Sequence, residues 1–147
     1  MKARTRARGL ALQVLYEIDL VGHPPVQVLQ DRLEEEPFPD ELAEFIRQII
    51  FGVLPLRKQL DHVLTRYAPE WPLDQIAAID QNILRIATWE FAAQGGTPVK
   101  VAINEAVELA KAYGSDSAPR FVNGVLGSLA EHENEVSQFL QSRKQDA

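Results

Sequence analysis

The sequence contains no cysteine and no long uninterrupted apolar run. The lack of cysteine excludes a disulfide framework and a thiolate metal site, and it is compatible with a reducing cytoplasm, where we expect the protein to act. The longest apolar run, residues 49–56, is interrupted by Gly52 and Pro55 and is far shorter than the roughly 20 residues that a membrane span needs. We therefore expect no membrane-spanning segment.

Catalytic, metal and cofactor motifs are also missing. The sequence has three histidines, which lie far apart and lack the spacing of metal ligands: His23, His62 and His132. No glycine-rich phosphate loop occurs, since Gly95 and Gly96 form an isolated pair typical of a turn. Glu105 and Glu108 share a helix face, which a solvated surface explains better than acid-base catalysis. We expect neither an enzyme nor a bound metal or cofactor.

Acidic residues are absent from the first sixteen positions, although the whole chain carries a net charge of −6. Four bases occur there, namely Lys2, Arg4, Arg6 and Arg8. The other 131 residues carry 11 bases and 21 acids, so their net charge is −10. A polyanion would therefore be steered to one end of the molecule. A solvated basic arm explains the charge alone equally well.

The apolar residues recur at helical spacing along nearly the whole chain, which predicts an all-α fold of about seven helices in two packed halves. The halves cover about residues 1–68 and 73–130, and the segment 68–72 is the expected hinge. The expected helices span residues 4–21, 26–35, 40–67 with a kink or break at Pro55, 73–78, 80–93, 99–113 and 117–130. Asp40, Asp80 and Ser117 are the expected N-caps. Residues 131–147 should form a polar tail, either frayed or with one docked turn around Val136, Phe139 and Leu140.

A polar stripe follows one side of the first expected helix. Its residues, spaced i, i+3, i+7 and i+10, are Arg6, Gly9, Gln13 and Tyr16. Arginine neutralises phosphates, glutamine reads base edges, tyrosine offers a stacking surface and glycine lets a backbone approach, a combination suited to single-stranded RNA. The alternative is that Tyr16 packs against the next helix and Gln13 is solvated.

A second polar face lies on the last major helix and contains Arg120, Asn123, Gly124 and Gly127, with Phe121 on its flank. Two helical glycines cost roughly 1 kcal/mol each relative to alanine, so their presence needs a reason. Close helix packing is the ordinary reason, and close approach of a ligand backbone is the other. Backbone N–H groups near Ser117 could also accept a phosphate.

The run KVAINEAVELAKAYGSDSAPRFVNGVLG, residues 100–127, closely resembles the signature of the NusB family. The segments RARGLALQVLYEID, FGVL and ILRIATWE extend the resemblance over about residues 4–130. It implies a NusB-like helical domain that binds boxA-type single-stranded RNA of ribosomal RNA leaders together with NusE, a small-subunit ribosomal protein. It also implies a role in transcription antitermination and termination control, with other Nus factors and RNA polymerase as partners. A homodimer is a further expectation from relatives.

The resemblance assigns RNA contact to the basic N-terminus, Tyr16, Tyr113, Arg120 and Phe121, and NusE contact to Asp80. With the residues argued above, the expected RNA-binding set is Lys2, Arg4, Arg6, Arg8, Gln13, Tyr16, Tyr113, Ser117, Arg120, Phe121 and Asn123. The expected partner-binding set is Ile76, Asp80 and Gln81. The chain departs from the family at Ser117, where members carry an acid, and at Pro119, which removes an N–H donor.

Two other functions stay open. A NusB-like domain also resembles the N-terminal part of a ribosomal RNA cytosine methyltransferase, but 147 residues leave no room for the catalytic domain or a methyl-donor site. A helical protein-protein adaptor would use the basic arm for solubility or for an acidic partner. RNA binding predicts an affinity that falls with salt at a log-log slope near −0.7 per phosphate contact, or roughly −3 for about four contacts, whereas the adaptor predicts no such dependence.

Overall fold

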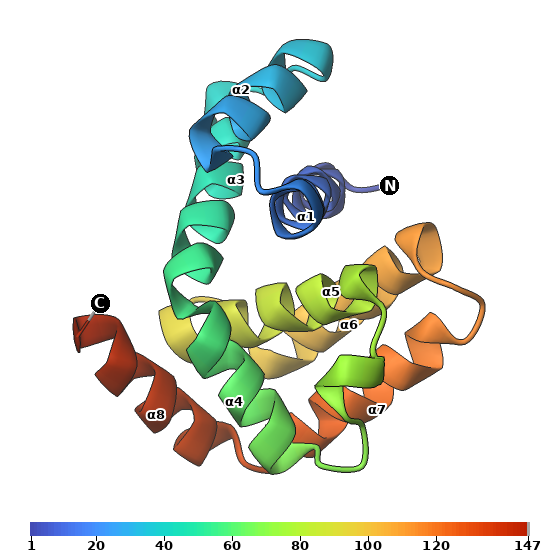
Figure 1. The fold of residues 1–147 in the computed structure, drawn as a ribbon, viewed down its shortest axis with the longest axis vertical. Coiled ribbons are helices and arrows are strands. Elements are labelled where there is room, and N and C mark those ends of the chain that lie inside the picture. The colour runs from blue at the N-terminus through green and yellow to red at the C-terminus, as the bar shows by residue number, and fades with distance from the viewer. Residues whose placement is uncertain (147) are drawn as a thin grey trace.

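The computed structural model describes the backbone of residues 1–146 and the side chains of residues 1–143, and within this range it contains helices and no β-strand. The expectation of an all-α fold is therefore confirmed (Figure 1). The elements in chain order are α1 (Ala3–Val21), α2 (Pro25–Glu35), α3 (Asp40–Val53), η1 (Leu54–Leu56), α4 (Arg57–Tyr67), η2 (Leu73–Gln75), α5 (Ala78–Thr88), η3 (Trp89–Gln94), α6 (Val99–Tyr113), α7 (Ala118–Ala130) and α8 (Glu133–Asp146). No helix among the described residues is both long and apolar enough to cross a membrane.

Proline and glycine set most of the helix boundaries. Gly22 and Gly95 adopt left-handed φ angles of 75° and 77° and end α1 and η3. Pro55 splits the expected helix 40–67 into α3, η1 and α4, as its missing N–H requires. The expected caps are less accurate, because Asp40 is the first residue of α3 and Asp80 the third of α5, while Ser117 occupies the cap position of α7 without a side-chain cap bond.

The helix expected over residues 80–93 changes from an α-helix to a π-helix at Trp89. It begins at Ala78, ends at Thr88, and continues as η3, a π-helix. The wider turn coincides with a tight contact to α3, since a Cβ placed on Gly52 would lie 2.2 Å from Cζ2 of Trp89. Glycine at position 52 therefore makes room for the indole at the start of η3, and the next residue, Glu90, is also buried.

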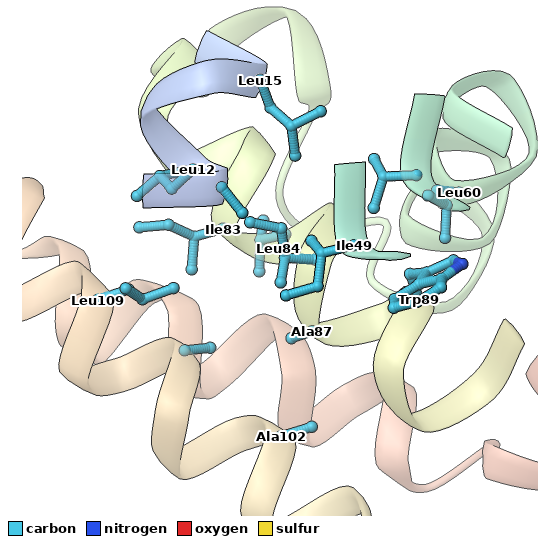
Figure 2. Packing of buried hydrophobic residues seen from close by; sticks show 14 of the residues in the cluster. Leu12, Leu15, Ile49, Leu60, Ile83, Leu84, Ala87, Trp89, Ala102 and Leu109 are labelled. Atoms are coloured by element: carbon cyan, nitrogen blue, oxygen red, sulfur yellow. The ribbon is translucent and has the colours of Figure 1, made fainter. Parts of the chain in front are cut away.

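One continuous hydrophobic core contains residues from α1 through α8, and Figure 2 shows part of it. Its largest fully buried side chains come from α1, α3, η1, α4, α5 and α6, and include Leu12, Leu15, Ile49, Leu60, Ile83, Leu84 and Leu109. Burial of each such side chain contributes about 1.5–3 kcal/mol. Because α1 packs on α3, α5 and α6, its position is fixed by helices that lie far apart in the chain.

The C-terminal segment is a docked helix, so the frayed tail expected from its polar composition is wrong, and α8 exceeds the single docked turn given as the alternative. Val136 and Leu140 of α8 are fully buried. The ring of Phe139 stacks on His62 of α4 with a centroid distance of 5.0 Å, and Gln141 Nε2 donates to the carbonyl oxygen of Ala92 in η3 at 3.2 Å. These contacts fasten α8 across α4 and η3.

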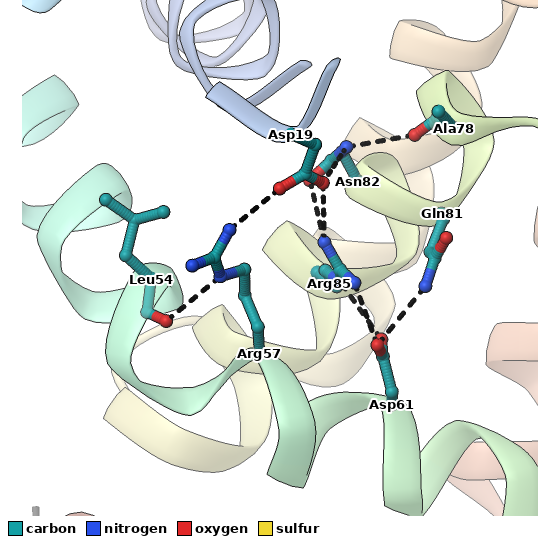
Figure 3. Close-up of polar contacts among 8 residues, drawn as sticks. All are labelled: Asp19, Leu54, Arg57, Asp61, Ala78, Gln81, Asn82 and Arg85. Atoms are coloured by element: carbon teal, nitrogen blue, oxygen red, sulfur yellow. Dashed lines mark hydrogen bonds and ion pairs between the residues drawn. The ribbon is translucent and has the colours of Figure 1, made fainter. Parts of the chain in front are cut away.

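A polar network ties the C-terminal end of α1 to α4 and α5 (Figure 3). Arg85 donates to Asp19 at 2.8 Å and, through two nitrogens, to Asp61 at 2.9 and 2.8 Å. Arg57 donates to the other oxygen of Asp19 at 2.9 Å. Burial alone would lower the pKa of Arg85, but the hydrogen bonds and charges of Asp61 and Asp19 raise it above its ordinary value. Arg85 therefore stays charged and holds the three helices together.

Candidate nucleic-acid interface

The first two turns of α1 present bases to solvent. Arg4 and Arg6 of α1 are exposed, as is Lys2, which directly precedes the helix. The Arg4 guanidinium lies 4.6 Å from the ring centroid of Phe45, and that of Arg6 lies 4.9 Å from the ring centroid of Phe38. Arg6 also lies 3.5 Å from Glu36, a contact between two half-exposed side chains that leaves the guanidinium open to a phosphate.

Arg8 does not belong to this exposed group, although the sequence placed it there. It is 5% exposed, and its Nε and Nη2 each donate to one oxygen of Glu90 at 2.9 Å. Its Nη1 lies 3.5 Å from Glu105, which also accepts a hydrogen bond from Thr5 at 2.7 Å. This bidentate buried pair leaves no room for an RNA phosphate, and it anchors the start of α1 to η3 and α6.

The polar stripe on α1 meets Tyr113, the last residue of α6. Gln13 Nε2 donates to the Tyr113 hydroxyl at 3.2 Å, and Arg32 of α2 donates to Gln13 Oε1 at 2.9 Å. A Cβ on Gly9 would lie 2.6 Å from the Tyr113 hydroxyl oxygen. The glycine therefore accommodates an aromatic ring of the chain itself, where the sequence suggested the backbone of a ligand.

A hollow of about 480 Å³ opens beside these residues. It is lined by Gln13, Tyr16, Glu17, Leu20, Val21, Arg32, Ile79 and Tyr113. Tyr16 and Tyr113 are half-buried, so each keeps part of its ring accessible. The hollow thus combines aromatic and aliphatic surface with amide and guanidinium groups, the chemistry that holds an unpaired base.

Glu17 is the acid in this hollow, and its charge is compensated. The hydrogen bond with His23 first, and then that with Arg32, lowers the pKa of Glu17 below its ordinary value. Both partners lie 3.1 Å from its carboxylate oxygens. Arg32, which the sequence did not single out, thus offsets the repulsion that Glu17 would exert on a nearby phosphate.

The turn after α6 and the start of α7 continue the surface beyond Tyr113. Ser117, Arg120 and Asn123 are exposed. Phe121 is half-buried and meets the Trp71 ring edge-on at a centroid distance of 6.2 Å. Trp71 also covers Gly124, where a Cβ would lie 3.4 Å from the indole. This is an ordinary van der Waals distance, so packing against Trp71 does not by itself require a glycine at position 124.

The expected partner-binding residues lie just before and within the first turns of α5, and Asp80 is the one among them that is buried. Ile76 and Gln81 are half-exposed, and Gln81 donates to Asp61 at 3.2 Å. Asp80 is only 8% exposed, and its Oδ1 has no hydrogen-bond partner among the described residues. A Cβ on Gly114 would lie 3.1 Å from this oxygen. Asp80 therefore lies under the turn between α6 and α7, and burial raises its pKa.

Comparison with known proteins identifies the family. The sequence model described as the NusB family matches residues 5–131. This chain belongs to the NusB family. The transcription antitermination protein NusB of Roseiflexus castenholzii is 48% identical over 136 residues, which cover 91% of this chain and 96% of that protein. The resemblance found in the sequence is thereby confirmed.

Solved structures agree with the NusB fold. NusB of T. maritima superposes with a TM-score of 0.76 at 28% identity, covering 93% of this chain and 92% of that one. A chain from a crystal structure of the antitermination factors NusB and NusE in complex with dsRNA has a TM-score of 0.79 at 24% identity, covering 89% of this chain and 99% of that one. At that identity the second match supports the fold alone.

The family match covers most of the candidate surface but ends before the docked C-terminal helix. The matched residues 5–131 extend from the third residue of α1 to the end of α7. They contain most of the surface described above, whereas α8 lies after them. Among the described residues no group of three or more histidine, aspartate or glutamate side chains is arranged to hold a metal ion. The surface described above combines bases, aromatic rings and amides with aliphatic side chains and the carboxylate of Glu17.

Proposed function

We propose that this NusB-family chain binds boxA-type single-stranded RNA of ribosomal RNA transcripts together with NusE, and acts in transcription antitermination and termination control. One observation carries the proposal. The helix that carries the exposed bases Arg4 and Arg6, and that Lys2 precedes, also supplies Gln13 and Tyr16, which line one hollow with Tyr113. Curated relatives that cover most of the chain are named transcription antitermination proteins, which supports the same role.

In this proposal the RNA backbone follows the exposed bases of α1 and one base enters the hollow. Each phosphate contact releases counterions, and stacking on an aromatic ring contributes about 1–3 kcal/mol per base. Beyond Tyr113 the strand continues over Ser117 toward Arg120 and Asn123, with Phe121 at its edge. Arg8 contributes by fixing the start of α1, since its own guanidinium is paired inside the protein.

NusE occupies a second surface, around Ile76 and Gln81. Asp80 supports this surface from beneath, since its side chain lies inside the fold. Other Nus factors and RNA polymerase join the assembly through NusE and RNA. The role is that of a binding factor in the cytoplasm, and it requires no catalysis by this chain.

The proposal is tested by titrating fluorescent boxA-like RNA and a scrambled RNA with the full chain, with and without NusE. We expect tighter binding to the boxA-like RNA and a further gain when NusE is present. Tyr16→Ala should weaken binding, while Tyr67→Ala, a half-buried tyrosine on α4, should leave it unchanged. Equal affinity for both RNAs would contradict the proposal. NusE binding without measurable RNA affinity would favour the adaptor function.

A further inference from the structure

A chain of hydrogen bonds runs along one wall of the hollow that contains Gln13 and Tyr113. Arg32 Nη1 donates to Gln13 Oε1 at 2.9 Å, and Gln13 Nε2 donates to the Tyr113 hydroxyl at 3.2 Å. Arg32 is held in turn by Glu17, since its Nη2 donates to Glu17 Oε1 at 3.1 Å. The chain thus joins α2, α1 and α6, and all four side chains line the hollow.

Arg32 sets the direction of this chain. A guanidinium group has donors and no acceptor, so the oxygen of the Gln13 amide must face Arg32 and the nitrogen must face Tyr113. The Tyr113 hydroxyl oxygen therefore accepts from Gln13, and its own O–H is left to donate. Within the described part of the chain, no atom accepts from this O–H or from the second N–H of the Gln13 amide. The chain of hydrogen bonds therefore ends in two unused donors.

The carboxylate in the same hollow is already engaged. Each oxygen of Glu17 has a partner at 3.1 Å, Arg32 on Oε1 and His23 on Oε2. The Tyr16 hydroxyl can donate or accept, so it does not restrict the ligand. The polar groups that are both unpaired and fixed in direction are therefore donors, and they require an acceptor atom from the ligand.

An uncharged base supplies this acceptor better than a phosphate. Much of the remaining wall is aliphatic, and it includes Leu20, which is 60% exposed, and Val21, which is 57% exposed. The carboxylate of Glu17 in the same hollow also disfavours an anion. Among the bases, uracil and guanine carry a carbonyl oxygen where cytosine and adenine carry an amino group. The amino group is itself a donor and would face the two donors of the protein.

We propose that Arg32 is a positioning residue that, through Gln13 and Tyr113, makes the hollow select a base with a carbonyl oxygen over one with an amino group. The inference rests on the proposed RNA binding and names the class of base that enters the hollow. Arg32 makes no contact with the base in this arrangement, since its guanidinium acts by orienting the Gln13 amide.

The test uses the full chain and fluorescent boxA-like RNA in which each uridine is exchanged for cytidine and each guanosine for adenosine, one position at a time. Fluorescence anisotropy gives the affinity for each RNA. The exchange leaves the charge of the RNA unchanged, so the ratio of the two affinities does not depend on the number of phosphate contacts. We expect one position at which the exchange weakens binding about threefold to tenfold, and at which Tyr113→Phe, which removes just the hydroxyl, brings the ratio near one.

Two variants test the direction of the chain at that position. Gln13→Glu keeps an acceptor for Arg32 but also accepts from Tyr113, which turns the hydroxyl oxygen toward the ligand as an acceptor. The RNA with the amino base should then bind at least as tightly as the RNA with the carbonyl base. Arg32→Met should bring the ratio near one because it frees the amide to turn, whereas Arg32→Lys should preserve the ratio because an ammonium group also has donors alone.

The matched control is Arg66→Met, an exposed arginine on α4, which should leave the ratio unchanged. Equal affinities for carbonyl and amino bases at every position would overturn the inference while leaving RNA binding in place. So would a ratio that Tyr113→Phe does not change, or a loss in Arg32→Met that is equal for both RNAs. Failure of every RNA to bind the parent chain would instead refute the proposed function. Tyr113→Phe decides the question even if circular dichroism shows that Gln13→Glu or Arg32→Met loses helical signal.

Discussion

The buried pair between Arg8 and Glu90 makes a quantitative prediction about stability. Removing one partner of such a pair costs about 3–5 kcal/mol, because the other charge is left without compensation in the interior. Glu90→Gln leaves Arg8 with Glu105, whose side chain is 18% exposed and lies 3.5 Å away. We therefore expect about 3 kcal/mol for this variant, near the low end of the range.

Arg8→Met is expected to cost more, near 5 kcal/mol. It leaves Glu90, which is 2% exposed, with the Thr97 hydroxyl at 3.3 Å as its remaining side-chain hydrogen bond in the described part of the chain. The double variant, with methionine at both positions, should be more stable than Arg8→Met alone, because no charge then stays buried. The order of stability, from highest to lowest, is thus parent, Glu90→Gln and Arg8→Met.

Urea unfolding followed by circular dichroism measures these differences. With slopes of about 1–3 kcal/mol/M, the single variants should lower the midpoint by roughly 1–5 M. Lys111→Met is the matched control, since Lys111 and Glu108 form an ion pair at 3.3 Å with both side chains more than half exposed. It should change stability by less than about 1 kcal/mol. If Arg8→Met behaves like this control, the buried pair does not anchor α1.

Three further variants test other contacts. Asp80→Asn should stabilise the protein at neutral pH, because burial raises the pKa of Asp80 in the folded state and so disfavours its charged form. This gain in unfolding free energy should vanish as the pH falls below the ordinary pKa range of aspartate. A gain that does not change with pH would contradict this cause. Gly9→Ala should displace Tyr113 and weaken RNA binding several-fold while global stability, measured by thermal unfolding, stays near that of the parent, since alanine favours the helix by about 1 kcal/mol. Leu140→Ala should cost about 2–5 kcal/mol in urea unfolding, and a negligible loss would mean that α8 is not part of the cooperative fold.

The helical architecture was predictable because its signals are local. The apolar spacing gave α6 its observed bounds, 99–113, and Pro55 marked the break between α3 and α4. The tail was misjudged because just two of the described side chains of α8, Val136 and Leu140, are fully buried within a polar sequence. Its docking depends on α4 and η3, which lie far away in the chain, so no local pattern reveals it.

The site was predictable in its residue types but less so in their orientation. Gln13, Tyr16 and Tyr113 come together around one hollow. Arg8 shares the spacing and charge of Arg4 and Arg6, and its burial depends on Glu90, which the π-helical turn of η3 places in the interior. The burial of Asp80 was not predictable for a similar reason, because it depends on the turn between α6 and α7, which covers it.

The salt dependence of RNA affinity tests the central claim most directly. Lys2, Arg4, Arg6 and Arg120 are exposed, so four phosphate contacts should give a log-log slope of roughly −3. Arg6→Ala should reduce the magnitude of the slope by about 0.7, whereas Arg66→Ala, an exposed arginine 5.6 Å from the Tyr67 ring on α4, should leave it unchanged. A flat profile, or equal changes in both variants, would contradict RNA binding along α1.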